Sequence, residues 1–166
     1  MSSMRDVCLH TATFSQLDAK TLYDLLRLRV DVFVVEQDCA YAELDGRDLE
    51  LTTTHLWLTF KGDERPVAYL RVLADTEGLR IGRVVTVPGL RRTGLAGLLL
   101  DAALHTVASD RTVRLHAQLS AVSLYAKRGF VTEGDVFLED DIPHIAMVRP
   151  AAAAMGHQER RNAGAR

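Results

Sequence analysis

The chain has 166 residues, 48% of them hydrophobic and 25% charged, with a formal net charge of −2 and a pI near 6.3. This is the size and composition of one soluble globular domain, and the small net charge gives no electrostatic footprint for nucleic acid. No apolar run approaches the roughly 20 residues of a membrane span and the N-terminus lacks a signal peptide, so we expect a cytoplasmic protein with neither nucleic acid nor membrane as a partner.

The first half of the chain is expected to form a strand, a long helix and then a group of strands. Residues 6–14 read as the opening strand, and residues 17–37 as a helix, because apolar residues recur there at three- and four-residue steps. An acidic loop follows over residues 38–50. Residues 54–88 read as three strands, since two groups of turn residues divide this stretch.

The second half is expected to alternate helices with strands. A helix is predicted over residues 92–108, a strand over 112–119, a short helix capped by Ser120 over 120–130, and two strands over 130–150. The resulting order, β-α-β-β-β-α-β-α-β-β, predicts an α/β fold in which helices flank a central mixed sheet.

Residues 1–150 are expected to form this single domain. Residues 151–166 have no apolar periodicity, and we expect them to be a mobile, solvated tail. Cys8 and Cys39 form neither a metal pattern nor a disulfide framework, so both are expected to be reduced thiols. Cys39 is a poor candidate for an acyl-accepting nucleophile, because the neighbouring carboxylates would raise the pKa of its thiol.

Three histidines are spread over predicted strands. His55 and His116 alternate with apolar neighbours, which favours structural roles for both. His144 starts a strand beside carboxylates and is the histidine we select as a catalytic candidate. No pair of these histidines has the spacing of metal ligands, and no metal is expected.

The segment "RRTGLAG", residues 91–97, joins a strand to a helix. The first turn of a helix offers free backbone N–H groups and a partial positive charge, which together bind anions. The small residues in this segment would let a phosphate approach those N–H groups, and its two arginines would add positive charge. The segment is neither a Walker loop nor a dinucleotide fingerprint. A Gly-rich helix start packed on a sheet, with solvated arginines, is the alternative interpretation.

Two motifs distinguish these interpretations. Arg91-x-x-Gly94-x-Ala96, after a strand and Pro88, resembles the pyrophosphate-binding motif of the GNAT acetyltransferase superfamily. The stretch "AQLSAVSLYAKRGF" resembles a second motif of that family, Asn-x-x-Ala-x-x-x-Tyr-x-x-x-Gly-Phe, with Gln118 at the asparagine position. Segments "LRVDVFVVEQDCAYAELDGRDLE" and "FLEDDIPHIAM" are similar to the ElaA-like branch and extend the resemblance over residues 20–149.

The resemblance implies a GNAT-like fold with a mostly antiparallel sheet of six to seven strands, splayed between the fourth and fifth strands. It also implies acetyl-CoA as a co-substrate, with Tyr125 as the proton donor to the departing sulfur. The implied acetyl-CoA-binding residues are Val84, Val85, Thr86, Arg91, Arg92, Thr93, Gly94, Leu95, Ala96, Gly97 and Gln118.

We therefore expect an N-acetyltransferase that moves an acetyl group directly to a primary amine of a small molecule or peptide. If the carboxylates of residues 36–50 line the acceptor site, they would attract a cationic amine. Many family members carry a glutamate on the strand before the pyrophosphate motif, where this chain has Arg80 and Arg83. A non-catalytic acyl-CoA-binding sensor or interaction module is thus the alternative, and a homodimer is left open.

Overall fold

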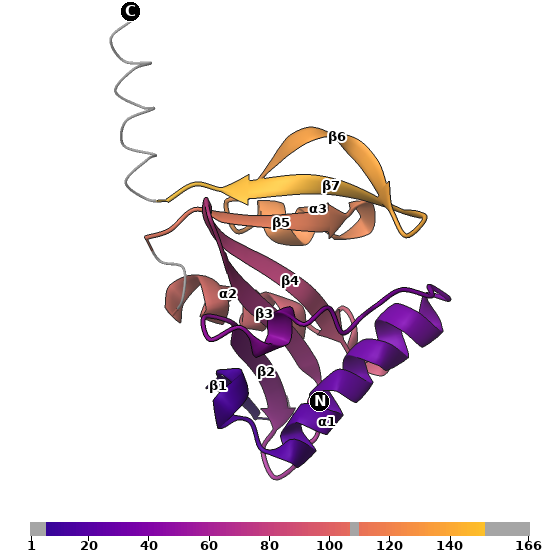
Figure 1. Ribbon diagram of the computed structural model, residues 1–166, viewed down its shortest axis with the longest axis vertical. Helices are drawn as coiled ribbons and strands as arrows, with labels where there is room; N and C mark the ends of the chain where they lie inside the picture. The colour runs from indigo at the N-terminus through magenta and orange to yellow at the C-terminus, as the bar shows by residue number, and fades with distance from the viewer. Residues whose placement is uncertain (1–5, 107–109, 152–166) are drawn as a thin grey trace, which may run out of the picture.

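The computed structural model describes residues 6–106 and 110–151, which form one seven-stranded sheet with helices on both faces (Figure 1). The strands are β1 (Val7–Ala12), β2 (Thr54–Phe60), β3 (Ala68–Asp75), β4 (Gly78–Thr86), β5 (Val113–Gln118), β6 (Val131–Glu139) and β7 (Ile142–Arg149). The α-helices are α1 (Ala19–Val30), α2 (Leu95–Thr106) and α3 (Val122–Ala126). Short turns are η1 (Phe14–Gln16), the π-helical η2 (Asp31–Glu36), η3 (Arg47–Leu49), η4 (Pro88–Leu90) and η5 (Leu119–Ala121).

The strand order is β1-β2-β3-β4-β5-β7-β6, and β4 and β5 are the parallel neighbours in it. Their pairing is short, because only Leu79 and Arg80 of β4 lie opposite β5 residues. Beyond Arg80 the two strands diverge (Figure 1). The prediction of a mostly antiparallel sheet splayed between its fourth and fifth strands is confirmed. The expected tail falls almost wholly on residues 152–166, outside the described residues.

Helices α1 and α2 cover opposite faces of the sheet. Leu56 and Leu58 of β2 pack in the core that contains α2, whereas Trp57 between them packs in the core that contains α1. This alternation follows from the two-residue period of a strand. Within the described residues no helix is long and apolar enough to span a bilayer.

Three predicted helix boundaries differ from the structure. The helix expected over residues 17–37 changes at Asp31 into the π-helical η2. Helix α2 starts three residues later than expected, because Arg92 (φ 64°) and Gly94 (φ 91°) are left-handed and cannot extend a right-handed helix. Ser120 does not cap α3: it lies in η5, and Ala121 is the N-cap residue.

A buried arginine joins α1 to the acidic loop of residues 38–50. Arg29 is only 1% exposed, and its Nε donates a 2.6 Å hydrogen bond to Glu43. Its Nη1 and Nη2 donate to the two carboxylate oxygens of Asp48, at 2.9 and 3.1 Å. Carboxylates in an acidic loop are ordinarily solvated, but these two are buried. Each is buried because an arginine neutralises it and satisfies its oxygens.

Side chains of β2 and β3 fix the same loop to the sheet. Arg71 of β3 donates to Asp48 at 2.9 Å and also hydrogen-bonds Asp45. His55 Nε2 donates to the backbone carbonyl of Asp48 at 3.2 Å, and its Nδ1 accepts from the Tyr69 hydroxyl at 2.7 Å. The structural role expected of His55 is confirmed. Its burial lowers its pKa and favours the neutral ring that these two hydrogen bonds need.

The ion pairs of Arg29 predict a large loss of stability when this side chain is truncated. Arg29→Ala leaves two carboxylates without their main cation in a buried site, which should lower the free energy of unfolding by about 3–5 kcal/mol. Arg27→Ala, on the same helix, removes only an exposed 3.7 Å pair with Asp31 and should cost about 1 kcal/mol or less. Urea denaturation of both variants measures the difference. Equal losses would show that the buried pairs are not what holds the loop.

Candidate functional site

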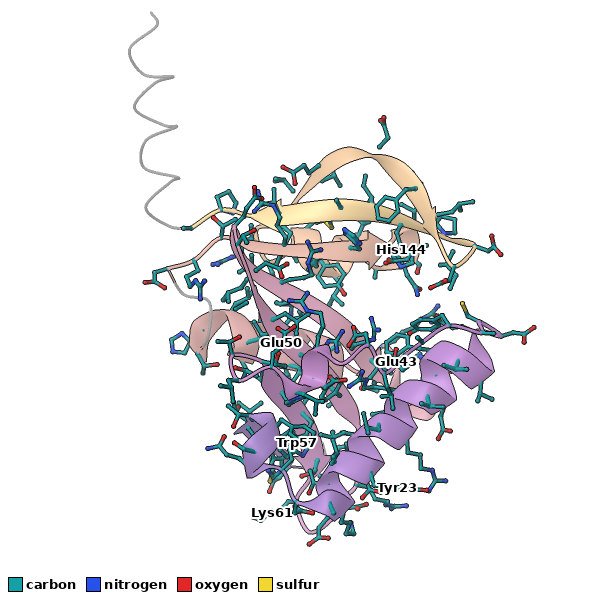
Figure 2. The ribbon with its side chains drawn as sticks, in the orientation of Figure 1. Tyr23, Glu43, Glu50, Trp57, Lys61 and His144 are labelled. Atoms are coloured by element: carbon teal, nitrogen blue, oxygen red, sulfur yellow. The ribbon has the colours of Figure 1, made fainter. Side chains whose placement is uncertain are left out.

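The divergence of β4 from β5 opens a cleft of about 830 Å³. Strand β4 forms one wall, and β5, α3 and the turn between β6 and β7 contribute the other, with η2 and the loop of residues 38–50 alongside. Figure 2 shows His144 on the β5–β7 half of the molecule and Glu43 across from it, next to α1. The cleft is the size of a small-molecule site.

A β-bulge lies in the β4 wall. Tyr69 pairs with Val85 and Arg71 with Gly82, so Arg83 and Val84 together face a single residue of β3. Arg83 has a positive φ of 56°, which is costly for a residue with a side chain. Bulges of this kind re-aim backbone and side-chain groups next to functional sites.

The Arg83 side chain is held from the acidic loop, which stabilises the bulge. Its Nε lies 2.7 Å from a carboxylate oxygen of Glu43, and its Nη2 donates to the Glu43 carbonyl at 3.2 Å. The guanidinium also lies over the Tyr41 ring, 5.6 Å from the centroid. The buried network around Arg29 therefore continues directly into the wall of the cleft.

Seven predicted site residues line this cleft, namely Val84, Val85, Thr86, Arg91, Gln118, Tyr125 and His144. Because β4 pairs with β5 only as far as Arg80, backbone groups at Val84–Thr86 that point toward β5 have no strand partner among the described residues. The other predicted binding residues, Arg92 to Gly97, lie outside the cleft lining at the start of α2.

Two glycines of the 91–97 segment have different roles. At Gly94 the backbone is left-handed (φ 91°), and no described atom lies within 4 Å of the position a Cβ would take. This is open space of the kind a phosphate needs. At Gly97 a Cβ would lie 2.5 Å from Nη2 of Arg128. Gly97 thus makes room for Arg128, which pairs with Asp101 at 2.7 Å, a structural reason for this glycine that the sequence did not indicate.

The two arginines of the segment also differ. Arg91 donates to both carboxylate oxygens of Glu36 in η2, at 2.6 and 2.8 Å. These hydrogen bonds lower the pKa of Glu36 and raise that of Arg91, so both stay charged at neutral pH. Arg92 is exposed and has no ion-pair partner among the described residues. An anion bound at Gly94 could therefore pair with Arg92 without competition from a carboxylate, whereas it would compete with Glu36 for Arg91.

Tyr125 reaches the cleft from α3 while most of its ring is buried. Its ring packs edge-on against Phe130, with centroids 6.0 Å apart. Burial raises the pKa of Tyr125 to about 12, so its hydroxyl is protonated and can donate a hydrogen bond at neutral pH. No described residue accepts a hydrogen bond from that hydroxyl. It is available to a ligand.

His144 is nearly buried on β7, and its tautomer is defined by its neighbour. Nδ1 lies 2.8 Å from the Ile142 carbonyl oxygen. Because a carbonyl only accepts, the proton of the neutral ring is on Nδ1 and the lone pair is on Nε2. The nearest carboxylate oxygen to Nε2 belongs to Glu139, at 3.7 Å. An imidazole with a free Nε2 lone pair in a cleft is suited to act as a general base.

His116 does not have the structural role that was expected of it. It is exposed and lines the cleft, whereas its neighbours Leu115 and Ala117 are buried. Its Nδ1 lies 3.7 Å from Oε2 of Glu139, the same oxygen that lies 3.7 Å from Nε2 of His144. The sequence shows that polar and apolar residues alternate along β5. It does not show that β4 diverges from β5, and this divergence is what exposes the polar face of β5 to a cleft. Glu139, which faces both histidines, was not singled out at all.

The remaining candidates give negative results. Burial raises the pKa of the Cys39 thiol, and the carboxylates of Asp140, Asp141 and Asp38 raise it further, which disfavours a nucleophilic thiolate. No group of three or more potential metal ligands occurs within residues 6–106 and 110–151. Glu36 and Asp45 line the cleft, but arginines neutralise both, so the segment 36–50 does not present the cation-attracting face that was considered.

Comparison with known proteins agrees with this geometry. A family model described as an acetyltransferase (GNAT) domain matches residues 22–150. A protein of Mycobacterium tuberculosis is 47% identical over 140 residues, covering 82% of this chain and 88% of the relative. The crystal structure of an acyl-CoA N-acyltransferase from Pseudomonas aeruginosa is similar with a TM-score of 0.76 at 40% identity, covering 87% of this chain and 99% of the other.

The chain belongs to the acetyltransferase (GNAT) family, an acyltransferase family. Within it the chain is ElaA-like. Escherichia coli ElaA is 40% identical over 146 residues, covering 84% of this chain and 94% of ElaA. The crystal structure of ElaA has a TM-score of 0.78 to this chain and covers 87% of it.

The ion pairs under the cleft predict a pH dependence of stability. Hydrogen bonds from Arg71 hold the pKa of Asp45 at about 2, below the ordinary value near 3.8. Because the folded-state pKa is the lower one, the stabilisation is complete above about pH 4 and is lost as the pH falls from there through about 2. Asp45→Asn should therefore flatten the fall in the free energy of unfolding over this range. Urea denaturation at several pH values measures it, with exposed Asp135→Asn as the control. Parallel curves for wild type and Asp45→Asn would contradict this assignment.

Proposed function

We propose that this protein is an acetyl-CoA-dependent N-acetyltransferase that transfers the acetyl group directly to a primary amine of a small molecule or peptide. One observation carries the proposal: three groups suited to this reaction line the same cleft. A strand edge without a partner, a hydroxyl that can donate a proton and an imidazole that can accept one all line it. The acceptor and the acetyl donor can thus meet between an acid and a base.

The binding part of the proposal uses backbone groups and the helix start. The free edge at Val84–Thr86 can hydrogen-bond the amide groups of a pantetheine arm in the manner of an added strand. The open space at Gly94 lies where α2 begins, and the N–H groups of a helix start attract phosphate oxygens. Arg92 and Arg91 supply positive charge to the same anion.

The chemical part gives His144 a proton transfer and Tyr125 a hydrogen bond. As the amine nitrogen bonds to the acetyl carbon, Nε2 of His144 takes the proton that the nitrogen loses. The bond from that carbon to sulfur breaks, sulfur leaves with the bonding electron pair as a thiolate, and the Tyr125 hydroxyl donates a hydrogen bond to it. With the pKa of Tyr125 at about 12 and that of a thiol ordinarily near 8.5, complete proton transfer is uphill. Tyr125 therefore acts chiefly by hydrogen bonding to the developing negative charge.

A non-catalytic acyl-CoA-binding module is the alternative. It is favoured by the arginines that stand on β4 where a catalytic glutamate is expected. His144 weakens that argument, because a base on the opposite wall of the cleft removes the need for a carboxylate on β4. Turnover with an amine distinguishes the two functions, since both predict binding.

CoA should stabilise the fold by mass action, because only the folded chain has the cleft. At a concentration 100 times the dissociation constant, the expected gain is about 2.7 kcal/mol. Thermal unfolding with CoA, NAD and ATP measures it, and a shift with NAD or ATP but none with CoA would end the proposal.

Gly94→Glu should abolish the CoA shift, because its carboxylate would fill the open space and repel phosphate. The left-handed backbone at Gly94 also predicts some loss of stability in this variant.

Tyr125→Phe should lower kcat by roughly 10²- to 10³-fold, the usual effect of losing one hydrogen bond to a developing negative charge. The ring and its packing against Phe130 are kept, so the affinity for acetyl-CoA should be close to that of wild type. Steady-state kinetics with an amine that the protein accepts measures both constants. Tyr23→Phe is the matched control, because Tyr23 is exposed on α1, away from the cleft. Wild-type turnover in Tyr125→Phe would remove this residue from the mechanism.

A further inference from the structure

We propose that Glu139 is a positioning residue for this reaction, which stabilises His144 in the protonated form that exists after it takes the proton of the amine. His116 lies at the same distance as His144 from the same carboxylate oxygen of Glu139. This inference rests on the proposed function, because it gives His144 the role of base. It adds a carboxylate that comes from β6, on the opposite side of the cleft from β4.

The interaction between Glu139 and His144 changes when His144 takes a proton. In the neutral ring, Nε2 has a lone pair and faces the Glu139 Oε2 atom, which also only accepts. Two acceptors cannot hydrogen-bond, and their separation of 3.7 Å is longer than a hydrogen bond. Once Nε2 gains a proton, the same pair becomes a charge-assisted donor and acceptor. The interaction thus arises only as the proton is transferred, and this is the kind of interaction that accelerates a reaction.

The tautomer of His116 follows from its own neighbour. Nη1 of Arg80 lies 3.5 Å from Nε2 of His116. Because arginine only donates, Nε2 of His116 is the acceptor and its ring proton is on Nδ1. That Nδ1 faces Oε2 of Glu139 at 3.7 Å. At 3.7 Å this N–H is close to the carboxylate without being hydrogen-bonded to it, so Oε2 is not already engaged when His144 becomes a donor.

Aromatic packing keeps the three side chains in this arrangement. The Phe137 ring stacks on His144, with centroids 6.1 Å apart, and meets His116 edge-on at 4.9 Å. Phe137 precedes Glu139 by two residues on β6, so both side chains point to the same face of the sheet. Two rotatable imidazoles are thus fixed by the same ring.

The charges around this group leave Glu139 as the partner available to His144. Arg80 is itself paired with Asp75 at 2.7 Å. The other titratable groups at this end of the cleft are Asp140, Asp141 and Cys39. No arginine or lysine within the described residues forms an ion pair with Glu139. Its charge is therefore not neutralised before His144 becomes a cation. The side chain is about half exposed, so water can then take the proton away.

Glu139→Gln tests the proposal, because it keeps the shape of the side chain and removes its charge. In the wild-type background kcat should fall about 10- to 100-fold, the effect of losing a hydrogen bond to a charged group. The KM for acetyl-CoA should not change. In a His144→Gln background the same substitution should change kcat by less than about twofold, because no imidazolium then forms. Glu133→Gln on the same strand, outside the cleft lining, is the control.

The outcomes separate this inference from the function on which it rests. Equal losses in both backgrounds, or no loss in either, with an active wild type, would overturn the role of Glu139 and leave the acetyltransferase intact. A raised KM for acetyl-CoA with an unchanged kcat would assign Glu139 to binding and would also overturn it. A wild-type protein that binds CoA but acetylates no amine would overturn both proposals.

Discussion

The buried ion pairs of Arg29 with Glu43 and Asp48 are the interactions on which the rest of the molecule depends. They bring a cation from the apolar side of α1 into contact with a loop that would otherwise repel itself. Removing either partner would leave a charge in a site that water does not reach, which is far more costly than losing a surface pair. These buried ion pairs therefore fix the position of the loop, although it has little regular secondary structure.

Arg83 connects this ion-pair network to the cleft. Its left-handed backbone forms the bulge of β4, and the Glu43 that binds Arg29 also binds Arg83. A single buried carboxylate thus links the helix, the loop and the wall of the cleft. The divergence of β4 from β5 leaves the edge of β4 and the side chains of β5 uncovered at the same place. The cavity, the free backbone groups and the exposed His116 have this one origin.

The sequence predicted the order of strands and helices from its periodicities. Two motifs, each within one strand–helix unit, also selected Val84–Thr86 and Tyr125, which the structure brings to one cleft. Their part in binding and catalysis stays a prediction. Contacts between distant segments were not predictable. Nothing local shows that Glu36 binds Arg91, or that Gly97 makes room for Arg128. Whether His116 faces the core or the cleft depends on which strands stay paired, and alternation alone does not decide it.

The central claim is that this cleft carries out acyl transfer to an amine. The most direct test is the release of free thiol from acetyl-CoA, followed with a panel of primary amines, amino acids, peptides and aminoglycosides. The account predicts that thiol is released at a rate that depends on the amine concentration, with formation of an equal amount of acetylated amine. Saturable CoA binding without amine-dependent thiol release from any member of the panel would contradict it.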